Sequence, residues 1–175
     1  SPLLTIVTLT WAIEFYFHKK VTDFNVLGRK NLLSNLNLKC EYIFVVMSLS
    51  FGLLTSDHVT LIDHYWPHHY ATSSFYFQLL VDSKSGYGLF KNGELVTWML
   101  IGECGNLTHL YTMEGHRKNG YAELIVKLIS NEILKDHTRD VFAFCVQKNE
   151  NARKLYEKIG FKRSHVRTVP CLEQE

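Results

Sequence analysis

The segment HRKNGYAELIVKLI, residues 116–129, decides the fold prediction because a glycine-containing loop leads directly into an amphipathic pattern. After Gly120, apolar side chains recur at intervals of three and four residues, namely Tyr121, Leu124, Ile125, Leu128 and Ile129. That spacing is typical of a helix with one buried face. The loop before it is therefore either an ordinary turn that enters a helix or a cradle for phosphate.

A helix start of this kind is suited to bind phosphate. The first turn of a helix has backbone N–H groups without helical partners, and the helix dipole favours negative charge there. Gly120 lets an anion approach the backbone, and the small side chain of Ala122 keeps the next turn open. Arg117 adds a charge-assisted hydrogen bond. The lysine-tailed P-loop and the three-glycine dinucleotide pattern are both absent, so a cradle here indicates a different cofactor.

The segment upstream of this loop predicts two helices and a hairpin. Residues 55–66 begin with Thr, Ser and Asp as N-cap candidates and end before Pro67. A second helix is predicted to begin at Ser73–Ser74 and to run through residue 80. Asn92–Gly93 lies between two apolar runs and tolerates the positive φ angles of a type I′ turn, which predicts a two-residue hairpin.

Around and after the loop, strands and helices alternate. We predict strands at 106–112 and 140–146, a short helix that begins at Asn149 and is capped by Gly160, and a last strand at 162–169. The unit from 106 to 146 is predicted to be a parallel crossover. The fold class is therefore α/β (α+β), with a mixed sheet and helices packed on it.

Composition limits the classes of function. The chain has 175 residues, 46% of them hydrophobic, and its net charge is +2, which argues against nucleic acid as a partner. The four cysteines are far apart and form no C-x-x-C pair, so a zinc ribbon is not expected. Their spacing favours reduced thiols and an intracellular location, cytoplasmic or alternatively mitochondrial.

Residues 1–50 give no secondary-structure prediction and are treated as a separate N-terminal segment. The apolar run at 2–17 is either a buried helix or strand, or a membrane or targeting segment. It is short for a membrane span, it contains Glu14, and its basic residues follow the apolar run rather than precede it. These features make a membrane role the less favoured alternative.

The segment NENARKLYEKIGF, residues 149–161, together with the R-x-x-G-x-A loop, resembles the GNAT acyltransferase superfamily. Over roughly residues 53–167 the chain looks like the glycine N-acyltransferase-like branch, in an insect-like style. The resemblance implies a GNAT domain at 51–175, with a mixed central β-sheet flanked by helices. It also implies transfer of an acyl or acetyl group from coenzyme A to an amine, by direct attack in a ternary complex.

The resemblance assigns roles to particular residues. The loop would hold the pyrophosphate of acetyl-CoA or another acyl-CoA, and the strand before it would bind the pantetheine amides. The implied cofactor-binding residues are Leu110, Tyr111, Thr112, Arg117, Lys118, Asn119, Gly120, Tyr121, Ala122 and Asn149. Tyr156 stands at the position of the usual general acid, although a tyrosine on this helix could equally be a core aromatic.

The general base is where the chain departs from the branch. Asn106 stands where the branch has a glutamate, and asparagine cannot accept a proton at neutral pH. His109 on the same strand is the predicted substitute, because an imidazole titrates near 6.5. Regular alternation puts Asn106 and His109 on opposite faces unless a bulge intervenes. Glu103, Glu114 or a base acting through water are the alternatives.

Three functions compete at this point. The first is an N-acyltransferase acting on a small-molecule amine or an amino acid. The second is a non-catalytic acyl-CoA-binding module, suggested by the missing glutamate, and the third is a protein lysine acetyltransferase. No metal is expected, because Pro67 interrupts the helix that would align His64 with His68 and His69.

Overall fold

The computed structural model of the chain describes residues 15–19, 48–135, 140–146 and 148–165. Within these ranges the backbone forms a seven-stranded sheet in the order β2-β3-β4-β5-β6-β1-β7. The strands are β1 (Phe15–Lys19), β2 (Leu49–Leu53), β3 (Gly86–Lys91), β4 (Glu94–Ile101), β5 (Leu107–Thr112), β6 (Val141–Cys145) and β7 (Lys162–His165). The helices are α2 (Val59–Tyr65), α3 (Ser73–Asp82), α4 (Tyr121–Leu134) and α5 (Glu150–Ile159), with 3-10 turns η2 (Ser56–His58) and η3 (Glu114–His116).

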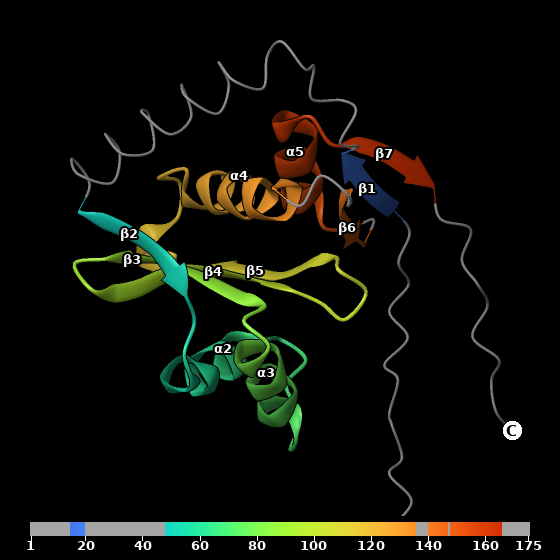
Figure 1. The fold of residues 1–175 in the computed structure, drawn as a ribbon. Coiled ribbons are helices and arrows are strands. Elements are labelled where there is room, and N and C mark those ends of the chain that lie inside the picture. Colours follow the sequence, from blue (N-terminus) through green and yellow to red (C-terminus); the bar gives the residue numbers. More distant parts are fainter. Residues whose placement is uncertain (1–14, 20–47, 136–139, 147, 166–175) are drawn as a thin grey trace, which may run out of the picture.

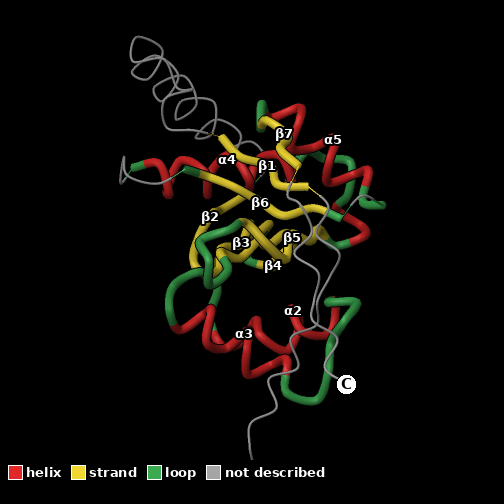
Figure 2. Tube along the Cα trace, turned by 90° about the vertical axis from the view of Figure 1, so that its right-hand side faces the viewer, coloured by secondary structure: helices red, strands yellow, loops and turns green. Residues whose placement is uncertain are grey.

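The described helices lie in two layers. Helices α2 and α3 cover one face of the sheet, and α4 and α5 lie on the opposite side (Figures 1 and 2). The Ser73 hydroxyl donates a hydrogen bond to the Asp63 carboxylate, which ties the start of α3 to α2. The predicted arrangement, a mixed sheet with helices packed on it, is confirmed.

Helix α4 packs on the sheet through the face that the sequence periodicity predicts. Tyr121 is 2% exposed, and Ile125 and Ile129 are fully buried in the core on this side of the sheet. Leu124 and Leu128, at the edge of the same face, are partly buried against that core. Because a fully buried aliphatic side chain contributes roughly 1.5–3 kcal/mol, this face fixes the position of α4 and of its first turn.

The hairpin and the parallel crossover also form as predicted. Asn92 and Gly93 have φ angles of 52° and 86°, the left-handed values that a type I′ turn requires. Strand β5 runs parallel to β6, but the pairing is limited to Leu107 and Ala143. Beyond that pair the ladder stops, so the carboxyl end of β5 presents backbone groups that β6 does not use.

Two strands that the sequence patterns do not reveal begin within residues 1–50. Strand β1 lies between β6 and β7 and is antiparallel to both, and β2 pairs antiparallel with β3. Residues 15–17 of the apolar run at 2–17 therefore belong to a strand, whereas residues 2–14 lie outside the described ranges. Among the described helices, none is both long and apolar enough to cross a membrane.

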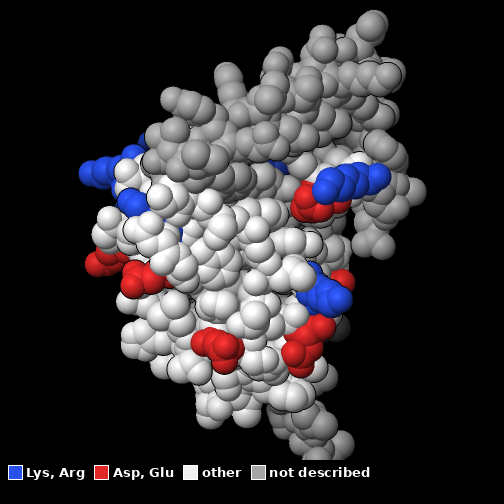
Figure 3. All heavy atoms as spheres, turned by 60° about the vertical axis from the view of Figure 1, so that its left-hand side comes forward, with Lys and Arg blue, Asp and Glu red and all other residues white. Residues whose placement is uncertain are grey.

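Charged side chains are scattered among uncharged ones on the face drawn in Figure 3, without a continuous basic stripe. One ionic cluster joins two helices. The Glu123 carboxylate on α4 accepts hydrogen bonds from Lys127 on the same helix (2.6 Å), and its other oxygen lies 2.7 Å from the Nζ atom of Lys158 on α5. Hydrogen bonds from Lys127 and Lys158 lower the pKa of Glu123. The cluster therefore stabilises the contact between α5 and α4.

Replacing Glu123 with Gln should loosen α5 at neutral pH. Because folding lowers the pKa of Glu123, the carboxylate stabilises the fold at any pH above the pKa of a carboxyl group in the unfolded chain. This stabilisation is lost as the pH falls through the lower pKa of the folded protein. We expect E123Q to reduce the free energy of unfolding by roughly 0.5–1 kcal/mol at pH 7 and to equal the wild type in strong acid. Urea unfolding at several pH values measures this. Amide hydrogen exchange in α5 at pH 7 should become faster in E123Q. It should stay unchanged in the control variant Glu132→Gln, which breaks an ion pair within α4 alone.

Candidate functional site

The loop before α4 forms an open backbone cradle. Gly120 is the N-cap of α4 with a φ of 80°, and Lys118 also has a positive φ of 63°. The first hydrogen bond of the helix runs from the Leu124 N–H to the Gly120 carbonyl (3.0 Å), so the preceding N–H groups have no helical acceptor. A Cβ atom added at Gly120 would meet no heavy atom of the described residues within 4 Å. The glycine is therefore required by the backbone angle, and the space beside it is available to a ligand.

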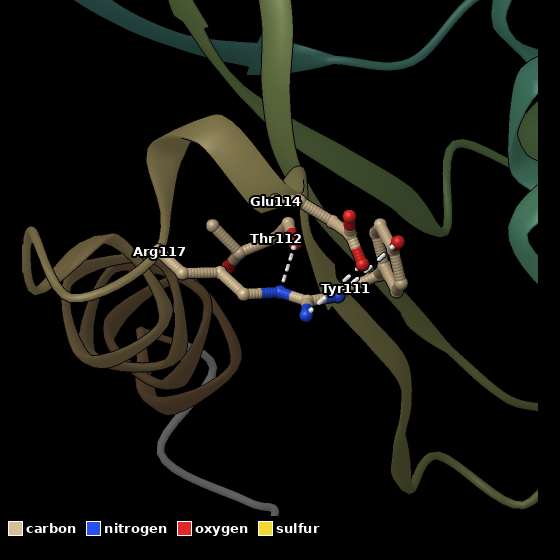
Figure 4. A network of polar contacts seen from close by, with 4 residues as sticks. All are labelled: Tyr111, Thr112, Glu114 and Arg117. Carbon is tan, nitrogen blue, oxygen red and sulfur yellow. Dashed lines mark hydrogen bonds and ion pairs between the residues drawn. The ribbon is translucent and has the colours of Figure 1, made fainter.

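Arg117 turns away from the cradle, toward the end of β5 (Figure 4). Its Nε donates to the Thr112 carbonyl (3.1 Å). Its Nη1 donates to the Glu114 carboxylate (3.4 Å), and its Nη2 donates to the Tyr111 hydroxyl (3.3 Å). The guanidinium carbon is also 5.4 Å from the centre of the Tyr111 ring. Its guanidinium thus links the loop to β5, instead of pointing at the helix start as a phosphate ligand would.

The remaining loop residues support this geometry. Asn119 donates from its side-chain amide to the carbonyls of His116 (3.0 Å) and Arg117 (3.2 Å), which holds the 3-10 turn in place. Tyr121 contributes only its backbone to the cradle, because its side chain is buried in the core, where its hydroxyl has no hydrogen-bond partner among the described residues. Ala122 follows in the first turn of α4. The predicted loop residues therefore lie together, but through backbone atoms more than side chains.

Strand β5 contains the bulge on which the sequence prediction for His109 depended. Thr108 pairs with Leu100 and Tyr111 pairs with Trp98, so His109 and Leu110 together oppose the single residue between them on β4. His109 has a φ of 52°, in the left-handed region. A bulge leaves one residue out of the ladder and redirects its side chain. Regular alternation therefore does not hold between Asn106 and His109.

The bulge forms one wall of a small cavity under α2 and α3. The cavity has a volume of about 50 Å³ and is lined mainly by aromatic rings, those of Tyr65, Trp66, Phe77, Trp98, His109 and Tyr111. The rings contact one another. The Trp98 and Tyr111 centroids are 4.9 Å apart, and the Tyr65 and Tyr111 centroids are 5.0 Å apart.

Burial changes the acid–base properties of His109. Its surroundings lower the pKa from the ordinary 6.5 to about 4, mainly through burial, while the charge of Glu103 acts in the opposite direction. The expectation that this imidazole titrates near 6.5 is wrong, because the rings of Trp66, Tyr76 and Phe77 pack against it and reduce its hydration. At neutral pH His109 is uncharged, and its Nδ1 is 3.0 Å from the Thr108 hydroxyl.

The other base candidates lie at the edges of this region. Glu103 accepts a hydrogen bond from the Tyr76 hydroxyl (3.3 Å) and is exposed in the β4–β5 turn. Asn106 accepts the Gly102 N–H through its backbone carbonyl (2.8 Å), so it serves that turn. Glu114 is engaged by Arg117. Among these carboxylates, only Glu103 is electrostatically coupled to His109.

Helix α5 positions Tyr156 and Asn149. The Asn149 side chain accepts the N–H of Ala152 (3.1 Å) and is the N-cap of the helix, and Gly160 ends it with a φ of 90°. Tyr156 is 4% exposed and packs against Phe161, with ring centroids 5.3 Å apart. Burial, and then the neighbouring Cys145, raise the pKa of the Tyr156 hydroxyl. Tyr156 is therefore protonated at neutral pH and packs as a core aromatic, whereas its role as a general acid stays a prediction.

The aromatic cavity was not predicted from the sequence. Its rings come from α2, α3, β4 and β5, which are separated along the chain, so no local spacing joins them. The one available signal was the density of aromatic and histidine residues in DHYWPHHY, residues 63–70. Among the described residues, no group of three or more His, Cys, Asp or Glu side chains is arranged to hold a metal ion.

Comparisons with known proteins agree with this fold. Residues 86–169, just under half of the chain, match the model of the FR47-like protein family. No curated protein matches the chain. A crystal structure of a Drosophila protein superposes with a TM-score of 0.63 at 22% identity, over 67% of this chain and 40% of the other. The present chain thus spans less than half the length of that relative.

Two further structures contain coenzyme A conjugates. Naa50 of Arabidopsis thaliana, in complex with the bisubstrate analogue CoA-Ac-MVNAL, has a TM-score of 0.53 at 17% identity, over 66% of this chain and 83% of that one. AAC(6′)-Iy, in complex with CoA-S-monomethyl-acetylneamine, has a TM-score of 0.58 at 10% identity, over 72% and 98%. The chain therefore has the fold of the GNAT acetyltransferases. None of these likenesses singles out the glycine N-acyltransferase-like branch.

The partly buried imidazole of His109 predicts a defined loss of stability in mild acid. Unfolding raises the pKa of His109 from about 4 to its ordinary 6.5, so the unfolded chain binds the proton first and stability falls from pH 6.5 to pH 4. The shift corresponds to about 3 kcal/mol. We expect His109→Asn to show a smaller loss over this interval, because asparagine accepts a positive φ but does not titrate. Equal slopes for both proteins in chemical unfolding from pH 4 to 7 would contradict the assignment.

Proposed function

We propose that this chain is an acyl-CoA-dependent N-acyltransferase that modifies a small-molecule amine or an amino acid. The observation that carries the proposal is the open first turn of α4, which follows directly from the end of β5. There, N–H groups free of helical partners adjoin a strand edge that β6 leaves unpaired. Such a pair of features suits a long cofactor with an anionic diphosphate and an amide-containing arm.

The chain's residues fit the two parts of coenzyme A in different ways. Backbone N–H groups from Lys118 to Ala122 would hold the diphosphate, because Gly120 leaves the approach open. Backbone groups from Leu110 to Thr112 would pair with the pantetheine amides like an added strand. The Thr112 carbonyl is now occupied by Arg117. Release of that contact would free both the carbonyl and the guanidinium for the cofactor.

The proposed reaction forms an amide and breaks the thioester. The amine nitrogen attacks the carbonyl carbon, the carbon–sulfur bond breaks, and the thiolate leaves. A backbone N–H at the bulge in β5, near Leu110, would stabilise the developing oxyanion, a role worth about 3 kcal/mol. Tyr156 would give its proton to the thiolate, and its raised pKa keeps that proton in place before reaction. The attacking nitrogen loses a proton to a base.

His109 is poorly suited to remove the proton from the attacking amine. A conjugate acid with a pKa of about 4 takes a proton less readily than an ordinary imidazole does, so the amine must arrive largely neutral or lose its proton through water. The same property, with Asn106 at the base position, favours the second candidate function, a non-catalytic acyl-CoA-binding module. Membership of the glycine N-acyltransferase-like branch is proposed on the sequence resemblance alone.

Thiol release with a panel of acyl-CoAs and amines tests the proposed function. We expect release that depends on both substrates, with calorimetric binding of coenzyme A alone. Binding without turnover on any small amine, amino acid or peptide would favour the binding module. Turnover on peptides but not on small amines would replace the proposed acceptor with a protein.

Replacing Gly120 with Val should weaken coenzyme A binding. A β-branched side chain disfavours the φ of 80° and projects into the space where the diphosphate would lie. We expect the Kd to rise at least about tenfold, or 1.4 kcal/mol. Gly93→Val is the matched control, because Gly93 has a φ of 86° and equally open space in the β3–β4 turn. If both variants bind coenzyme A like the wild type, the cradle assignment fails.

Replacing Tyr156 with Phe separates the catalytic interpretation from the structural one. The ring would keep its packing against Phe161, so we expect the Kd for coenzyme A to change less than twofold. Loss of the proton donor should lower kcat by roughly a hundredfold or more. Steady-state kinetics with acetyl-CoA measures this. An unaltered kcat would remove Tyr156 from the mechanism and leave it as a core residue.

A further inference from the structure

The side chain of Arg117 lies on the edge of β5 where the proposed function places the pantetheine arm. The Met113 N–H donates to the Val96 carbonyl of β4 (2.9 Å), and the next pair in the ladder is Thr112 with Thr97. Opposite residues of an antiparallel ladder alternate between hydrogen-bonded and non-hydrogen-bonded pairs. The backbone groups of Thr112 therefore point away from β4, to the edge that β6 leaves unpaired. Because the Arg117 Nε donates to the Thr112 carbonyl there, a cofactor arm paired along this edge would have to displace the side chain.

Two further side chains hold the guanidinium in this position (Figure 4). The Glu114 carboxylate accepts a hydrogen bond from Nη1 (3.4 Å), and the Tyr111 hydroxyl accepts one from Nη2 (3.3 Å). The guanidinium carbon is 5.4 Å from the centre of the Tyr111 ring, within the range of a cation–π contact. That ring stacks on Trp98, which is 2% exposed, with centroids 4.9 Å apart. The position of Arg117 is therefore fixed by contacts that lead back to the core.

Arg117 has two uses that exclude each other. The sequence prediction places its guanidinium on the diphosphate, beside the cradle that begins one residue later at Lys118. The structure places it on Thr112, Glu114 and Tyr111, with the side chain turned away from that cradle. One side chain cannot be in both places, so binding of the cofactor must first break the contacts that the structure shows.

We propose that the contact of Arg117 with Thr112, Glu114 and Tyr111, called here the Arg117 contact, is autoinhibitory and lowers the affinity of the chain for coenzyme A. The inference rests on the proposed function, because it concerns regulation of the same site. It gives the Glu114 carboxylate and the Tyr111 hydroxyl a role opposite to that of cofactor ligands, since both stabilise the conformation that excludes the cofactor. Weakening either group should tighten binding, whereas removing a group that supports the bound conformation would weaken it.

Calorimetric titration with coenzyme A tests the sign of this effect. Tyr111→Phe removes one hydrogen-bond acceptor and keeps the ring and the net charge, and Glu114→Gln removes the ionic partner. We expect each substitution to lower the Kd by roughly two- to fivefold, because exposed pairs of this kind contribute up to about that factor. Both substitutions keep the size of the side chain, so either variant supplies the comparison if the other does not fold.

Glu94→Gln is the matched control for charge. Glu94 is exposed at the start of β4, and in the described part of the chain no ion pair joins it to Arg117. Losing a carboxylate can by itself favour an anionic ligand. We expect the Kd of Glu94→Gln to stay within about 1.5-fold of the wild type, because an exposed charge without a direct contact is screened by salt.

A second background shows whether the effect depends on Arg117. In Arg117→Met the guanidinium is absent, so adding Tyr111→Phe or Glu114→Gln should no longer change the Kd. Each double variant is compared with Arg117→Met alone, and any effect of the methionine on the cofactor cancels in that ratio. Equal tightening in both backgrounds would overturn the inference, because the effect would then not depend on Arg117.

The remaining outcomes separate this inference from the proposed function. Tightening by Tyr111→Phe or Glu114→Gln that Glu94→Gln does not share, and that disappears in Arg117→Met, supports the Arg117 contact as autoinhibitory. Wild-type binding that neither variant tightens would refute this inference alone. So would equal tightening by Glu114→Gln and Glu94→Gln with no effect of Tyr111→Phe, because net charge would then explain it. Absence of coenzyme A binding by the wild type and by every variant would refute the proposed function itself.

Discussion

The position of the site depends on the burial of one face of α4 against the sheet. Tyr121, Ile125 and Ile129 are within 2% of complete burial, so the helix cannot shift without opening the core. Its first turn is therefore fixed beside the end of β5. The backbone angle at Gly120 then leaves the helix start uncovered. The same packing that stabilises the domain thus holds in place the backbone N–H groups on which the proposed function places the diphosphate.

The parts of the proposed site lie next to one another, beginning at the first turn of α4. The cradle at α4 adjoins the unpaired edge of β5, and that edge leads to the bulge at His109 and Leu110. On the other face of the bulge lies the aromatic cavity under α2 and α3. The arrangement separates a region of backbone polar groups, on which the proposal places the cofactor, from a region lined mainly by aromatic rings. Arg117 connects the two, because it contacts Thr112 and the ring of Tyr111 at once.

Features with local causes could be predicted from the sequence, whereas features with distant causes could not. The periodicity of α4, the Asn92–Gly93 turn and the Gly160 cap act within a few residues, and all three form as predicted. Strand β1 was missed because its partners β6 and β7 lie more than a hundred residues away. The lowered pKa of His109 depends on rings from other elements. The roles of Tyr156 and Asn149 remain predictions, since their packing suits a structural role as well.

Hydrogen exchange with and without coenzyme A tests the central claim most directly. The account places the diphosphate on the backbone N–H groups at the start of α4, which have no helical acceptors in the free protein. It therefore predicts that coenzyme A slows amide exchange across residues 118–122, and also at Leu110 and Thr112 on β5. Unchanged exchange at these amides in the presence of saturating coenzyme A, or slowing confined to other parts of the chain, would contradict it.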